Sequence, residues 1–181
     1  MNDATEDRPS KVQAAPAEAS RALSDHPWWA LSALLIGLSM IVIDGSVVNV
    51  LLPDMVDDLQ LTTTDVLWVN SIYSLIFASL LIPIGLVSDK YGRRKLFLIG
   101  TVVFMLGSFG AGASTGPDML IALRAVQAIG ASMMLPSSVA IINVMFTGKQ
   151  RAMAFGLWGA VFGGAAALGP LLGGWLAQDY S

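Results

Sequence analysis

The 181-residue chain contains no cysteine and only one histidine, His26. The absence of cysteine excludes disulfides, thiol catalysis and thiolate metal sites. One histidine in the polar N-terminal region provides neither a catalytic His pair nor a His-based metal cluster. Charged residues make up 13% of the chain, whereas soluble domains contain roughly 25%. Because 55% of the residues are hydrophobic and the mean hydropathy is +0.67, the composition indicates a membrane protein.

Long apolar runs fill most of the chain after residue 26. Each run is long enough for a helix to cross a hydrocarbon core about 30 Å thick. The polar tail, residues 1–26, is rich in Ala, Pro, Ser and charges and is predicted to be disordered. The rest, residues 27–181, is predicted to be an all-α membrane domain with five transmembrane helices, at about 28–52, 65–88, 93–113, 118–146 and 152–178.

The connections between these helices differ in charge. The first loop, residues 53–64, contains three aspartates and no basic residue, and Thr64 or Asp65 is expected to cap the next helix. Lys and Arg gather in the tail and in the two other turns that share its side of the membrane. By the positive-inside rule, that side is cytoplasmic in a multi-pass protein of the cell membrane. Nine of the ten basic residues lie there: Arg8, Lys11, Arg21, Lys90, Arg93, Arg94, Lys95, Lys149 and Arg151.

Two charged residues, Asp44 and Arg124, lie inside predicted transmembrane helices. Either one costs roughly 2.5 to 3.5 kcal/mol near the centre of a membrane helix. At 1.5 Å per residue, Asp44 lies about 12 Å and Arg124 about 9 Å from the outer ends of their helices. We therefore expect them to pair, directly or through water. The pair is either a functional site or a structural link that only joins two helices.

Other polar or large side chains extend this candidate site. Gln127 lies one helical turn beyond Arg124, and its face is interpreted as the wall of a wet cavity, although polar stripes also occur in helix packing. Asn70 is a weaker candidate, for which packing is favoured. Met134 and Trp158 are candidates for contact with an apolar substrate, with contact to the core or to lipid as the simpler alternative.

Four motifs resemble those of one family of membrane proteins. The turn after residue 84 is similar to the Gly-x-x-x-Asp-x-x-Gly-Arg-Arg/Lys signature of the major facilitator superfamily, here Gly85, Asp89, Gly92, Arg93 and Arg94. Segment 124–130 resembles the Arg-x-x-Gln-x-x-Gly element. The last helix resembles the antiporter signature Gly-Pro-x-x-Gly-Gly, here Gly169, Pro170, Gly173 and Gly174. Segment 44–53 resembles the Asp-x-Thr-Val-Val-Asn-Val-Ala-Leu-Pro element of the 14-helix drug:proton antiporters.

This resemblance implies proton-coupled efflux of drugs or other hydrophobic or cationic compounds by alternating access. Asp44 would then accept the proton and Arg124 would act as its switch. The proton is the coupling ion, and no other cofactor is expected. Because members contain twelve or fourteen helices, we expect the chain to be an N-terminal fragment. A sixth helix and a C-terminal bundle would be its partners, beside the lipid bilayer and the substrate.

The sequence also bears on other functions. An intramembrane enzyme is disfavoured, because the chain has no His-Glu-x-x-His motif, Ser–His pair or paired intramembrane aspartates. No nucleic-acid partner is expected. A superfamily carrier for a metabolite or sugar is the nearest alternative, followed by a membrane fragment that transports nothing. For the basic residues of segment 85–95, anchoring to lipid headgroups is an alternative to a conformational role.

Overall fold

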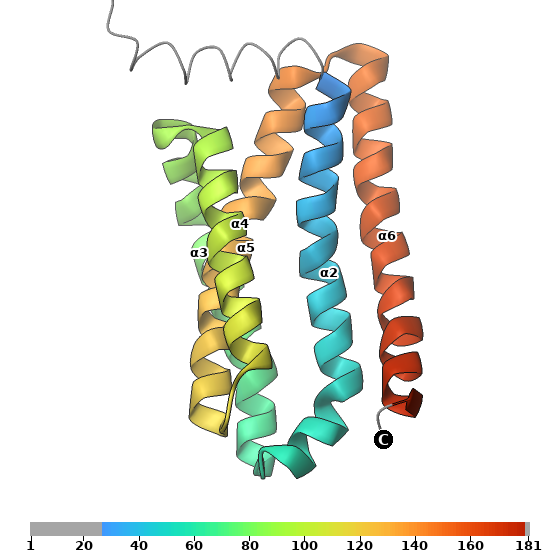
Figure 1. Cartoon of the computed structure of the whole chain (residues 1–181). Coiled ribbons are helices and arrows are strands. Elements are labelled where there is room, and N and C mark those ends of the chain that lie inside the picture. Colours follow the sequence, from blue (N-terminus) through green and yellow to red (C-terminus); the bar gives the residue numbers. More distant parts are fainter. Residues whose placement is uncertain (1–26, 180–181) are drawn as a thin grey trace, which may run out of the picture.

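The computed structural model describes the backbone of residues 27–179 and the side chains of residues 27–167. The predicted disordered tail, residues 1–26, lies outside the described residues. The described part consists of five α-helices (Figure 1): α2 (Pro27–Asp58), α3 (Thr63–Tyr91), α4 (Arg93–Gly112), α5 (Pro117–Met145) and α6 (Gly148–Asp179). Four of them, α2 to α5, are long and apolar enough to cross a membrane. The structure therefore has the all-α membrane architecture that the sequence predicts.

The first helix is longer than expected. The sequence predicts an end near residue 52, before Pro53, but α2 continues to Asp58 with Pro53 inside it. The reason is packing: Met55 and Val56 lie beside a small apolar cluster centred on Leu61, Val69 and Leu120. A proline removes one backbone donor, and this partial burial holds the five following residues in a helix. The predicted loop over residues 53–64 is thus wrong, since only a short connection remains.

Thr62 caps α3, not Thr64 or Asp65 as predicted. Its hydroxyl accepts a hydrogen bond from the Asp65 backbone N–H at 3.3 Å, and Asp65 Oδ2 accepts one from the Thr62 N–H at 2.9 Å. This reciprocal capping box satisfies two donors that a helix N-terminus leaves free. Asp65 therefore belongs to the cap as the third helical residue.

The turn between α3 and α4 is a single residue, Gly92. Its φ of 103° lies in a region that side chains with a Cβ rarely adopt, which accounts for glycine at this position. The Gly92 N–H donates to Ser88 O at the end of α3, and Gly92 O accepts from the Leu96 N–H in α4. Most of the charged segment 85–95 is therefore helical, and only Gly92 lies between the two helices.

The helices pack in two groups that meet along α2 and α5. In Figure 1, α3, α4 and α5 lie together, while α2 runs alongside α6. Glycines bring α4 and α5 close: a Cβ on Gly130 would lie 2.5 Å from the backbone N of Phe104. The main apolar core includes Leu34 and Leu38 of α2 together with Phe104 of α4. The polar site described next lies where the two groups of helices face each other.

Candidate functional site

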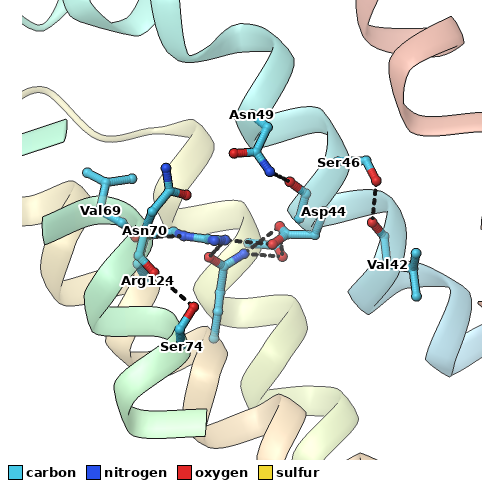
Figure 2. Close-up of polar contacts among 11 residues, drawn as sticks. Val42, Asp44, Ser46, Asn49, Val69, Asn70, Ser74 and Arg124 are labelled. Atoms are coloured by element: carbon cyan, nitrogen blue, oxygen red, sulfur yellow. Dashed lines mark hydrogen bonds and ion pairs between the residues drawn. The ribbon is translucent and has the colours of Figure 1, made fainter. Parts of the chain in front are cut away.

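Asp44 of α2 and Arg124 of α5 form a direct ion pair. Arg124 Nη1 donates to Asp44 Oδ2 at 2.7 Å, and Figure 2 shows the two side chains pointing toward each other. The exposed fractions of the two side chains are 3% for Arg124 and 16% for Asp44. The similar depths predicted from the sequence are thus realised as a direct pair. Such a pair is costly to break, because either partner would be left as an uncompensated charge in an apolar environment.

Gln127 and Ser108 complete the polar contacts of the Asp44 carboxylate. Gln127 Nε2 donates to Asp44 Oδ1 at 2.7 Å and lies 2.7 Å from Ser108 Oγ, while its Oε1 accepts from Arg124 Nη1 at 3.0 Å. The Ser108 hydroxyl contacts Asp44 Oδ1 at 3.3 Å. Gln127 is therefore a buried member of the ion-pair site, and its place on the wall of a wet cavity stays a prediction. Ser108 of α4 was missed, because an isolated serine in an apolar helix has no signal in the sequence pattern.

Two residues of α3 hold Arg124 from the other side. The ring of Tyr73 lies against the guanidinium, with its centroid 4.4 Å from Arg124 Cζ. Arg124 Nε also donates to the backbone carbonyl of Val69 at 3.5 Å, and Val69 lies one turn before Tyr73 on α3 (Figure 2). Sequence reasoning missed both contacts. Tyr73 lies four residues after Val69, so the two share a face of α3, but nothing in the sequence places that face on α5.

The remaining substrate candidates make other contacts in this conformation. Asn70 is half-buried, and its backbone carbonyl accepts a hydrogen bond from Ser74 (Figure 2). Met134 is fully buried in the main core. Trp158 packs beside that core, stacks on Phe162 with 4.4 Å between ring centroids and donates to Ser138 Oγ at 3.5 Å. In this conformation Met134 and Trp158 therefore make packing contacts.

The motif at the α3–α4 turn forms a second polar site. Arg93 pairs with Asp89 at 2.8 Å and its Nη1 donates to Ala140 O of α5 at 3.2 Å, so Arg93 connects three helices. Gly85, deeper in α3, faces Pro136 of α5, since a Cβ there would lie 3.9 Å from the proline Cβ.

A cavity of about 580 Å³ opens beside this turn. It lies between α2 and the ends of α3, α4 and α5. Its described lining includes Arg93 and Arg94 and, on the apolar side, Leu34 and Phe97. The cavity therefore has basic groups at the turn and an apolar wall from α2 and α4. The antiporter motif predicted on α6, Gly169, Pro170, Gly173 and Gly174, lies outside the described side chains.

Apolar helices of spanning length around a buried ion pair define a multi-pass membrane protein. Residues 34–181 match the family model of the Major Facilitator Superfamily, and the chain belongs to that family. It is 39% identical over 174 residues to the puromycin resistance protein pur8 of Streptomyces alboniger. This alignment covers 94% of this chain and 35% of that protein. It is 33% identical over 178 residues to the tetracenomycin C resistance and export protein of Streptomyces glaucescens, covering 98% of this chain and 32% of that protein.

The fold has a counterpart among solved structures. A bacterial homologue of the human lysosomal transporter Spinster, in an inward-facing and occupied conformation, matches 84% of this chain and 33% of its own length. The TM-score is 0.75 and the sequence identity 23%, so this likeness concerns the fold. The chain spans about one third of the length of the curated relatives it matches.

Proposed function

We propose that this chain supplies the first helices of an exporter that moves hydrophobic or cationic compounds out of the cell in exchange for protons. The observation that carries the proposal is the ion pair of Asp44 and Arg124 inside membrane-spanning helices. Export is favoured over other transport because the relatives are named for antibiotic resistance and, in one case, for export. Substrate movement and proton binding are the chemistry of this site, so the chain is proposed to act as a carrier and not as an enzyme.

Asp44 is the proposed proton acceptor. A proton on Asp44 Oδ2 would remove the carboxylate charge that Arg124 Nη1 contacts at 2.7 Å. The donors Gln127 and Ser108 would still face Oδ1, so the neutral carboxyl would keep polar partners. Protonation would therefore weaken the link between α2 and α5 without leaving Asp44 unpartnered. Separation of Asp44 from Arg124 would therefore accompany proton uptake, and renewed pairing would accompany proton release.

The rest of the transporter would convert this local change into alternating access. We propose that a sixth helix and a C-terminal bundle complete the two halves that rock about a central substrate site. The N-terminus and the α3–α4 turn would face the cytoplasm, where Asp89, Arg93 and Arg94 would break and remake contacts between the halves. Asn70 and Trp158 remain proposed substrate contacts in other conformations, in which the helices separate.

The test is Asp44→Asn in the complete transporter, assayed as substrate uptake into inside-out vesicles that carry a proton gradient. Asp57→Asn is the matched control, because Asp57 is exposed near the end of the same helix. We expect Asp44→Asn to reach the membrane at normal levels and to lose gradient-driven transport, while Asp57→Asn retains it. Full gradient-driven transport by Asp44→Asn would overturn the proposal. A substrate panel that gives transport of sugars alone would indicate a metabolite carrier instead.

A further inference from the structure

Tyr73 is held in an unusual position for a tyrosine. Its ring covers the Arg124 guanidinium at 4.4 Å and stacks on Phe77 at 6.1 Å between centroids. Its hydroxyl is buried and has no hydrogen-bond partner among the described residues. Burying a hydroxyl without a partner is unfavourable. The ring contacts must therefore hold Tyr73 in place, and the strongest candidate is the cation–π contact with Arg124.

Besides its hydrogen bond to Gln127, Arg124 has two sets of contacts. One set is the ion pair with Asp44 of α2. The other set, Tyr73 and Val69 of α3, lies on the neighbouring helix of the same group as α5 and does not involve α2. When Asp44 takes up a proton, only the first set loses its charge. The guanidinium would then depend on the α3 contacts, together with Gln127, as the partners of a buried cation.

We propose that Tyr73 is a positioning residue that retains Arg124 on α3 when Asp44 is neutral. It thereby lowers the cost of protonating Asp44, because the arginine freed from the carboxylate keeps a partner. This inference rests on the proposed function only in taking Asp44 as the proton acceptor. Contact with the Tyr73 ring and the Val69 carbonyl would also keep Arg124 beside α3 when α2 and Asp44 move away.

The direction of the pH effect follows from the charges around Asp44. The titratable or charged groups that face it among the described side chains are Arg124 of α5 and Tyr73 of α3. From α4 it meets the uncharged Ser108, and the described charged residues of α6, Lys149 and Arg151, lie at its start. The ring stabilises a guanidinium without its carboxylate more than one that is already paired. Loss of the ring should therefore favour the state in which Arg124 stays paired with the Asp44 carboxylate.

The first experiment measures the pH dependence of gradient-driven transport by the complete transporter. For Tyr73→Leu we expect the half-maximal pH of transport to move by about half a unit to more acidic values. A shift of this size is within the range of energies for one cation–π contact. Tyr73→Phe and Tyr73→Trp keep a ring face and should restore the wild-type midpoint. Trp68→Leu is the control, because it removes an aromatic ring of the same helix that is 49% exposed. An unchanged or more alkaline midpoint for Tyr73→Leu would overturn the inference.

The second experiment does not depend on transport. Thermal unfolding of the purified protein is measured for Tyr73→Leu alone, for Asp44→Asn alone and for both together. We expect Tyr73→Leu to lower the midpoint further when residue 44 is already neutral, because Arg124 then relies on the ring. Equal losses in the two backgrounds would contradict a retaining role for Tyr73. The unfolding midpoints of these three variants can be interpreted even if Asp44→Asn transports normally. Failure of the proposed function and failure of this inference are therefore distinguishable.

Discussion

Gly107 of α4 lies directly against Gln127 of α5, and a Cβ atom at position 107 would come within 2.7 Å of Gln127 Cγ. The glycine therefore makes the space in which Gln127 reaches Asp44. We expect Gly107→Ala to destabilise the protein by about 1–3 kcal/mol, the usual cost of overpacking a close contact. Thermal unfolding in detergent measures this change. Gly112→Ala, on the same helix where a Cβ meets nothing within 4 Å, should leave the midpoint nearly unchanged.

Gln127 donates to the same carboxylate that Arg124 contacts, but through the other oxygen. Gln127→Leu keeps the side-chain volume and removes this donor. Because a hydrogen bond to a charged group contributes about 1.5–3 kcal/mol, we expect transport at limiting substrate to fall by about tenfold or more. Gln150→Leu is the control, since Gln150 is exposed at the start of α6. Wild-type transport by Gln127→Leu would show that the second oxygen of Asp44 needs no such donor.

Arg93 connects Asp89 of α3 to the end of α5, yet its pair with Asp89 is exposed to solvent. Exposed ion pairs contribute about 1 kcal/mol or less, so Arg93→Ala should change unfolding stability little. We nevertheless expect slower transport, because the proposed role of this turn is to change contacts between conformations. Lys95→Ala, a neighbouring exposed cation, tests simple headgroup anchoring. Equal transport losses in both variants would favour anchoring over a conformational role.

The similar depths of Asp44 and Arg124 were sufficient to predict their pairing, because helical rise converts sequence distance into depth in the membrane. The order of the five helices followed equally well from apolar run length. The helix ends could not be predicted as well: Pro53 signals a stop, but the packing of Met55 and Val56 continues α2 to Asp58. The contacts of Ser108 and Tyr73 with the ion pair could not be predicted for another reason. Each is one polar group on an apolar helix, and only the packing of α3 and α4 on α5 brings it to the ion pair.

A purely structural ion pair makes a different prediction from a coupling site. Replacing a buried pair by apolar residues of similar volume is often neutral or stabilising by about 1–4 kcal/mol. We therefore expect Asp44→Leu with Arg124→Leu to insert and unfold much like the wild type, and to lose gradient-driven transport completely. Membrane yield, thermal unfolding and vesicle uptake are measured on the same preparations. Retained transport in the double variant would reduce the pair to a link between α2 and α5.

The most direct measurement of proton coupling is the number of protons that substrate addition releases from the purified complete transporter in weakly buffered solution. We expect release from the wild type and from Asp57→Asn, because the proposed proton of Asp44 leaves as substrate binds. Asp44→Asn should bind substrate and release none. Proton release of wild-type size from Asp44→Asn would contradict the assignment of Asp44 as the proton acceptor.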